Sequence, residues 1–228
     1  MNIPFIWIIF GILFVLSLVA SKSVESKFKK YSKIPMNYRM TGREVAEQML
    51  RDNDIRDVTV QEVNGTLTDH YNPVNKTLNL SHNVYHGDSV AAAAVAAHEC
   101  GHAVQHATAY YWLGLRSKLV PAVNISNKLT PWILFAGILF VTKFPQLLLA
   151  GIILFAVTTL FSFITLPVEL NASRRALVWL STHNITTPDT HPYAEKALRA
   201  AAYTYIIAAL TSLATLLYYL LIYLGNRD

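Results

Sequence analysis

The chain of 228 residues is poor in charge and almost without cysteine. Only 14% of its residues are charged, against roughly 25% in an ordinary soluble domain, and its mean hydropathy is +0.33. Its single cysteine, Cys100, excludes an intrachain disulfide. The basic residues are scattered beside apolar runs and form no DNA- or RNA-binding motif, which excludes nucleic acid as a partner. The composition indicates a mainly α-helical membrane protein.

Positive charge is also missing from the start of the chain. Residues 3–20 form an apolar run long enough to cross about 30 Å of hydrocarbon as a helix, and no basic n-region precedes it as in a signal peptide. We therefore expect an uncleaved transmembrane anchor over residues 1–21. Because positive charge collects on the cytoplasmic side, we expect residue 21 onward to lie inside the cell. The lysines that follow the run are Lys22, Lys27, Lys29, Lys30 and Lys33.

Three further apolar runs predict membrane helices, which gives about four in all. Residues 119–167 predict a helical hairpin, interrupted by a turn at residues 143–146. Its first arm is the weaker one, because the apolar part is short, whereas residues 147–166 are long enough to span. Residues 203–228 predict the last span. Both flanks of the hairpin, residues 22–118 and 168–202, then lie on the cytoplasmic side.

The polar segment 22–118 is expected to contain a small β element and a helix. Thr41 and Glu44 have the spacing of a capping box that opens a helix. Residues 58–63 alternate like a strand, and Asn64-Gly65 predicts a hairpin turn to a partner strand at residues 67–71. Residues 77–81 alternate again. A helix should begin near Asp88-Ser89 and continue through an alanine-rich stretch to residue 102 and beyond.

One pattern in that helix carries metal chemistry. His98-Glu99-Cys100-Gly101-His102 has the H-E-x-x-H spacing, which places both histidines on one helix face. Imidazole suits zinc, and Glu99 is placed to take a proton from a zinc-bound water. The motif therefore predicts a hydrolase with one catalytic Zn²⁺, and it favours a peptidase. A catalytic zinc also needs a third protein ligand.

A third histidine is not available near the motif. The extension x-x-G-x-x-H fails, because Gln105 and Thr108 stand where its glycine and histidine would be. His106 lies about 12 Å along the helix from His98, too far to share one ion. We expect His106 to pack or to support another residue.

Carboxylates are scarce after the motif, which narrows the choice of ligand. The candidates are Glu169, Asp189, Glu195 and Asp228. Glu195 resembles a routine i,i+4 partner of Arg199. Glu169 opens a helix-like segment at the end of the hairpin, with small residues on its face, and we favour it as the ligand. The alternative is an interfacial carboxylate paired with Arg174 or Arg175.

Other residues are weaker candidates for the site. A tetrahedral oxyanion needs a hydrogen-bond donor, and His70, Arg174 and Arg175 could provide it or support the ligands. His183 and His191 are further candidates, although each of these side chains is more often structural. Residues Thr77, Leu78, Asn79, Leu80 and Ser81 are a candidate edge strand for an extended substrate. The alternative is an ordinary structural strand.

The motifs together resemble a known family, the bacterial neutral zinc metallopeptidases of the membrane protease YugP type. The resemblance rests on residues 67–71, 77–81, 96–106, 115–117 and 168–176. The layout is also similar to HtpX-type and CAAX-type membrane peptidases, in which a glutamate ligand follows a membrane hairpin and an aspartate lies four residues later. Here that position is Ser173. The resemblance implies a gluzincin-like core with zinc on His98, His102 and Glu169.

The expected function is that of a multi-pass metalloendopeptidase in the bacterial cell membrane, with its active site facing the cytoplasm. It would hydrolyse a protein or peptide by zinc-activated water, with Glu99 as general base and acid. Two alternatives stay open, a zinc hydrolase acting on a non-peptide bond and a catalytically silent zinc-binding scaffold or regulator. An intact Glu99 argues against the silent alternative, because a non-catalytic zinc site needs no base.

Overall fold

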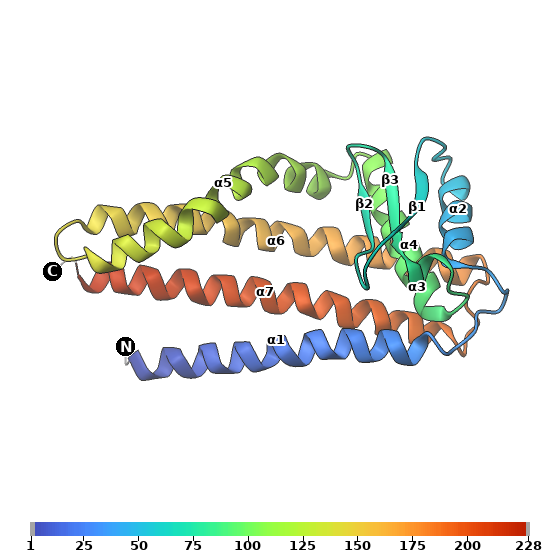
Figure 1. The fold of residues 1–228 in the computed structure, drawn as a ribbon, viewed down its shortest axis with the longest axis horizontal. Helices are drawn as coiled ribbons and strands as arrows, with labels where there is room; N and C mark the ends of the chain where they lie inside the picture. Colours follow the sequence, from blue (N-terminus) through green and yellow to red (C-terminus); the bar gives the residue numbers. More distant parts are fainter. Residues whose placement is uncertain (1–2, 227–228) are drawn as a thin grey trace. The chain divides into compact units, whose positions relative to one another are not determined.

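The computed structural model describes residues 3–226 of the chain. The first two residues of the expected anchor and the last two of the expected C-terminal span, Arg227 and Asp228, lie outside the described part. Seven helices and three strands follow one another along the described chain (Figure 1). They are α1 (Ile3–Tyr31), α2 (Gly42–Asp52), β1 (Thr59–Val63), β2 (His70–Asn72), β3 (Thr77–Ser81), α3 (His82–Tyr85), α4 (Val90–Ala107), α5 (Tyr111–Leu139), α6 (Pro145–Thr182) and α7 (His191–Gly225).

The chain divides into two compact units, one of helices alone and one that contains the sheet. The helical unit comprises residues up to 19, residues 114–166 and residues from 204 onward. The second unit comprises residues 20–113 and 167–203. The long helices α1, α5, α6 and α7 contribute residues to both. The H-E-x-x-H motif and Glu169 both belong to the second unit.

Within the helical unit, α5 and α6 form a hairpin. A Cβ on Gly137 of α5 would meet the Leu148 backbone of α6 at 2.6 Å, so the two helices pack closely beside their turn. Farther from the turn, the Thr158 hydroxyl donates to the Asn127 side chain at 3.0 Å. One contact lies near the turn and the other lies farther from it, so α6 runs back alongside α5.

The expectation of four membrane spans is wrong. Among the described residues, three helices are long and apolar enough to cross a membrane: Ile6–Tyr31, Pro145–Thr182 and His191–Gly225. Helix α5 fails because Arg116, Lys118 and Lys128 occupy its first two thirds. The apolar stretch that remains, Leu129–Leu139, is only about 16 Å long as a helix, about half the hydrocarbon thickness. The first arm of the hairpin is therefore not counted as a span.

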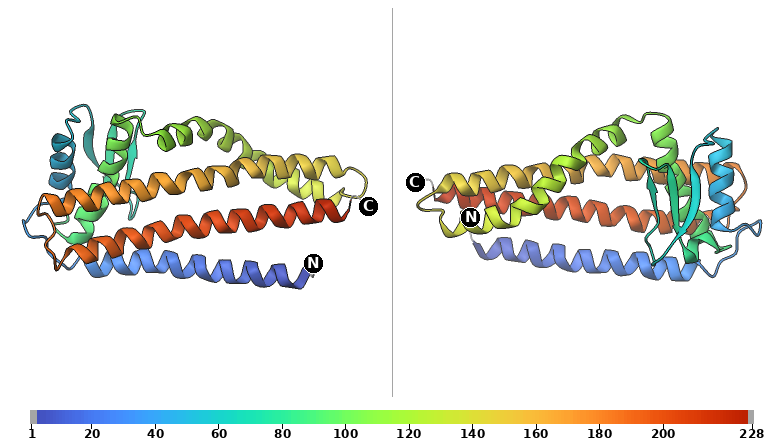
Figure 2. Two further views of the ribbon diagram at one scale, coloured as in Figure 1. Left: turned by 180° about the vertical axis from the view of Figure 1, so that it is seen from behind. Right: turned by 45° about the horizontal axis from the view of Figure 1, so that its top comes forward.

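In the second unit, helix caps form where the sequence predicts them. The Thr41 side chain accepts from the Glu44 backbone while the Glu44 carboxylate accepts from the Thr41 N–H, which completes the capping box of α2. The Ser89 hydroxyl accepts from the Ala92 N–H and caps α4. The alanines of α4 are buried almost without exception, so α2, α3 and the sheet can approach its backbone. Figure 2 shows these elements gathered around α4 from two further sides.

The three-stranded sheet has the order β1-β3-β2, which corrects two expectations. The predicted hairpin of residues 58–63 and 67–71 does not form, because β1 pairs with β3 in parallel instead. Strand β3 is therefore the central strand, so Thr77, Leu78, Asn79, Leu80 and Ser81 are not a sheet edge. Leu78 and Leu80 are fully buried on one face, and the buried polar side chains of the other face find partners within the protein.

Candidate metal centre

Helix α4 brings the two histidines of the motif to one face. The rings of His98 and His102 lie 4.9 Å apart between centroids, as expected for positions i and i+4. Both side chains are largely buried, with 13% and 11% of their surface exposed. The alanine-rich sequence favours this helix and leaves little bulk on its remaining faces, because alanine costs the least on entering a helix and has the smallest side chain after glycine.

Helix α6 brings Glu169 to the same place. Residues 145–182 form one helix that continues through Pro167, so Glu169 lies inside α6 and does not open a separate helical segment. The approach to α4 depends on small residues, since a Cβ on Gly101 would lie only 2.6 Å from the Ala172 carbonyl oxygen. Glu169 Oε2 is then 3.3 Å from His98 Nε2 and 3.6 Å from His102 Nε2.

The donor set of this cluster fits a zinc ion. One nitrogen from each histidine and a carboxylate oxygen of Glu169 all lie within 4.8 Å of one another. Zinc ligands at about 2.0–2.2 Å in a tetrahedron are separated by roughly 3.3–3.6 Å, and the two histidine–glutamate distances have these values. Two imidazoles and a carboxylate, with a fourth position left for water, are a set that catalytic zinc sites use.

Hydrogen bonds to the far side of each ring hold the histidines in the orientation that ligation needs. Gln105 donates its amide to the Val168 carbonyl at 2.8 Å, so its oxygen faces His102 Nδ1 at 3.0 Å. An oxygen can only accept, so Nδ1 carries the proton and Nε2 keeps its lone pair for a metal. On the other ring, the Ser173 hydroxyl lies 3.1 Å from His98 Nδ1.

Negative charge dominates the surroundings of His102. Burial by itself lowers the pKa of His102, but the hydrogen bond to Glu169 and the charges of Glu99 and Glu169 outweigh burial and raise that pKa. The field that favours a protonated imidazole also favours a bound cation. The cluster is therefore suited to a divalent metal by charge as well as by geometry.

Glu99 is held by the edge strand β2. The Tyr71 N–H donates to Glu99 Oε2 at 3.1 Å, and only 8% of Glu99 is exposed. Beside it, Asp69 accepts from the Ser81 N–H at 2.7 Å. Burial raises the pKa of Asp69, and the nearby charge of Glu99 raises it further, against the lowering effect of the Ser81 hydrogen bonds. The sheet thus fixes one oxygen of the expected base.

The other histidines and arginines that the sequence suggested lie outside this cluster. His70 Nδ1 bonds the Thr68 carbonyl, Arg175 donates to Asn171, and Arg174 is exposed. His183 stacks on Trp179, His191 bonds Thr186, and His106 bonds the Tyr71 hydroxyl. Within the described residues, none of them joins the cluster of ligand atoms.

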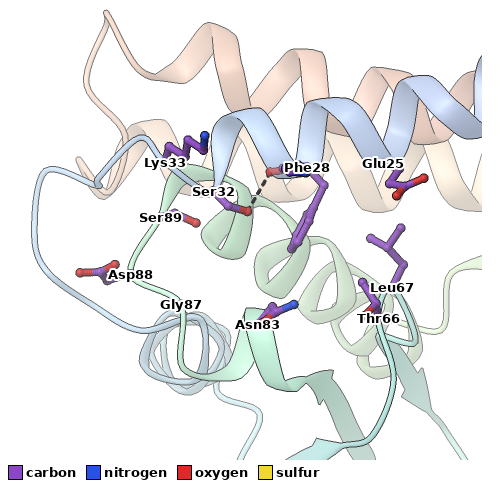
Figure 3. A pocket seen from close by; sticks show the side chains of 11 residues that line it. Glu25, Phe28, Ser32, Lys33, Thr66, Leu67, Asn83, Gly87, Asp88 and Ser89 are labelled. Atoms are coloured by element: carbon purple, nitrogen blue, oxygen red, sulfur yellow. Dashed lines mark hydrogen bonds between the residues drawn. The ribbon is translucent and has the colours of Figure 1, made fainter.

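Two pockets in the same unit do not include the ligands of this cluster in their walls. One of about 460 Å³ is bounded by the end of α1, the β1–β2 loop and the residues between α3 and α4, and its wall includes Phe28, Leu67 and Asn83 (Figure 3). The other, of about 320 Å³, includes Arg174, Arg175 and Trp179. Neither pocket is lined by a histidine of the motif or by Glu169.

The sequence argument gave no supporting role to Gln105 or Tyr71, two of the four residues that surround the ligands and Glu99. Gln105 and Ser173 contact the rings, whereas Tyr71 and Asp69 flank Glu99. The contact of Gln105 with His102 could have been predicted, since Gln105 lies three residues after His102 on the same helix. The others depend on which faces of distant elements meet.

Comparison with known proteins places the chain in a family. The family model described as "Putative neutral zinc metallopeptidase" matches residues 6–224, so the chain belongs to this family. The chain is also 43% identical over 213 residues to a Bacillus subtilis (strain 168) protein described as "Putative membrane protease YugP". That alignment covers 93% of this chain and 94% of the relative. No solved structure matches significantly. The resemblance inferred from the motifs is thereby confirmed.

Proposed function

We propose that the protein is a membrane-integrated zinc metalloendopeptidase with a gluzincin-like site, in which His98, His102 and Glu169 hold one zinc ion. The observation that carries the proposal is the convergence of these three side chains within 4.8 Å, although Glu169 is 67 residues beyond His102 on another helix. The family description supports zinc and peptidase activity. The relative's description supports a membrane location.

The chemistry divides between the metal and Glu99. A zinc ion bound here would act as a Lewis acid toward a scissile carbonyl and lower the pKa of a bound water. Glu99 is next to His98 on the same helix, so its carboxylate is beside the ligands. Because the Tyr71 N–H engages Oε2, we assign to Oε1 the acceptance of the water proton and its later delivery to the leaving amine.

Strand β2 offers an extended peptide a place to lie. It is an edge of the sheet, paired only with β3 among the described strands. The Tyr71 N–H points from this edge to Glu99. An edge strand can bind an extended chain alongside it, so a peptide added here would pass the base. The proposed substrate is therefore a protein or peptide in an extended conformation.

The charge distribution supports a cytoplasmic active site in a bacterial membrane. The lysines after the first apolar run and the basic residues Arg174, Arg175, Lys196 and Arg199 all belong to the unit that holds the motif. The positive-inside rule assigns such residues to the cytoplasm. Labelling of Lys33→Cys with a membrane-impermeant maleimide tests this assignment. Reaction only in opened cells supports it, whereas reaction in intact cells contradicts it.

Two substitutions test the mechanism in protein purified in detergent. Glu99→Gln should keep zinc content at the wild-type value and abolish cleavage of an unfolded, fluorescently labelled protein. Glu169→Ala should lower zinc affinity, because a ligand is lost. Glu195→Gln is the matched control, since Glu195 pairs with Arg199 on the surface. Undiminished proteolysis by Glu99→Gln contradicts the mechanism, and zinc binding without any wild-type proteolysis favours the silent scaffold.

A further inference from the structure

A second cluster of potential metal ligands lies on the surface of the sheet-containing unit. It consists of Glu62 on β1, His82 at the start of α3 and His86 just after that helix. One ligand atom from each residue lies within 4.8 Å of the other two. The cluster shares no residue with the site formed by His98, His102 and Glu169. All three side chains are exposed, so an ion can reach them from solvent.

The carboxylate of Glu62 divides its two oxygens between the two rings. Oε1 is 2.7 Å from His82 Nδ1, and Oε2 is 3.1 Å from His86 Nε2. The ring centroids are 4.9 Å apart. These hydrogen bonds lower the pKa of Glu62, so the carboxylate is ionised at neutral pH. The arrangement gathers an anionic oxygen and two imidazole nitrogens around one point.

The backbone that carries these residues is fixed by buried neighbours. Glu62 is opposite Leu80 in the parallel pairing of β1 with β3. Strand β3 runs directly into α3, so His82 follows Ser81 without a loop. Leu80 and Val84 are fully buried and hold the strand and the helix in the core. The three ligand-bearing positions therefore need little backbone rearrangement to close on an ion.

We propose that Glu62, His82 and His86 form a second site for a divalent transition-metal ion of the zinc class. Neutral imidazole and carboxylate are ligands that Zn²⁺, Ni²⁺ and Cu²⁺ accept, and water would complete the coordination. An ion there joins β1 to α3, the element that leads into α4. Its affinity is lower than that of the first site, because the exposed side chains lose conformational freedom on binding.

The number of ions bound to the full-length protein tests the proposal. Protein purified in detergent without a polyhistidine tag is dialysed against buffered Zn²⁺, and bound zinc is counted by mass spectrometry. Wild type should bind two ions, with the weaker one at least tenfold weaker. His82→Ala and Glu62→Gln should each bind one. The matched control is His183→Ala, which removes a surface histidine beside a single carboxylate, Asp52, and should still bind two.

A second arm removes the first site. In His98→Ala/His102→Ala, one equivalent should remain, and adding His86→Ala should weaken it at least tenfold. With Cu²⁺ as the probe, the electron paramagnetic resonance spectrum of the double variant should show nitrogen ligation that disappears with the third substitution. One ion in wild type, or a second ion unaffected by His82→Ala, overturns the proposal. Because wild type and His82→Ala decide the count, the test does not depend on the double variant folding.

Discussion

Helices α4 and α6 approach each other closely at Gly101, and replacement of this glycine by alanine tests how the site is held together. An added Cβ would lie 2.6 Å from the Ala172 carbonyl oxygen and 3.0 Å from its Cα. The first distance is about 0.8 Å too short for an ordinary contact. The obstacle is backbone, so α4 and α6 must move apart by a similar amount. Zinc–ligand distances tolerate only about 0.2 Å.

We therefore expect Gly101→Ala to lower zinc affinity by about 10–100-fold, which corresponds to roughly 1.4–2.8 kcal/mol. Overpacking should also cost about 1–3 kcal/mol of stability. Competition with a chelator measures the affinity, and thermal unfolding in detergent measures the stability. Gly114→Ala is the matched control, because Gly114 is also helical and a Cβ there meets nothing within 4 Å. If the two variants bind zinc equally well, the close approach does not position Glu169.

Three further predictions concern single side chains. Ser173→Ala removes the hydroxyl beside His98 Nδ1 and should weaken zinc binding about 10–100-fold in a chelator competition. Glu44→Gln should cost about 0.3–1 kcal/mol at neutral pH, measured by thermal unfolding. The Thr41 backbone hydrogen bond lowers the pKa of Glu44, so this stability is present above pH 4.5 and is lost as pH falls towards the folded pKa. Burial raises the pKa of Cys100, whose thiol should react with a disulfide reagent only as the protein unfolds.

Each of these has an outcome that would contradict it. Ser181→Ala is the control for the serine substitution, since its hydroxyl bonds only the Val178 carbonyl, and equal zinc affinities would deny a role for Ser173. For Glu44, a stability difference that stays constant from pH 7 to pH 3 would show that its charge is irrelevant. For Cys100, reaction faster than unfolding would mean that the thiol is accessible in the folded protein.

Local features of the fold were predictable because they depend on neighbouring residues. The capping box of α2 requires only Thr41 and Glu44, and the start of α4 requires Ser89 before a run of alanines. The placement of His98 and His102 on one face follows from helix geometry alone. A family resemblance could also be inferred, since the motifs occur in combination over most of the chain, and the family match confirms it.

Strand pairing was not predictable from the same kind of signal. Asn64-Gly65 indicated a hairpin between residues 58–63 and 67–71, yet β1 pairs with β3. Strand pairing depends on how each strand is buried in the core, which neighbouring residues in the sequence do not reveal. Leu78 and Leu80 are fully buried, as in a strand flanked on both sides. The fourth span was overestimated because the first arm of the hairpin, although its apolar part is short, was still counted as a crossing. Glu169 was singled out because few carboxylates follow the motif and because small residues share its face of a helix-like segment.

The ring of His98 is supported by a hydroxyl and not by a carboxylate, since Ser173 contacts its Nδ1. A hydroxyl can accept the ring N–H and fix its orientation, but it has no charge to raise the basicity of the imidazole. Glu169, Glu99 and Asp69 already place three carboxylates in this region, and Glu99 raises the pKa of Asp69. A fourth would increase that repulsion, so serine keeps the ring oriented at the expense of zinc affinity.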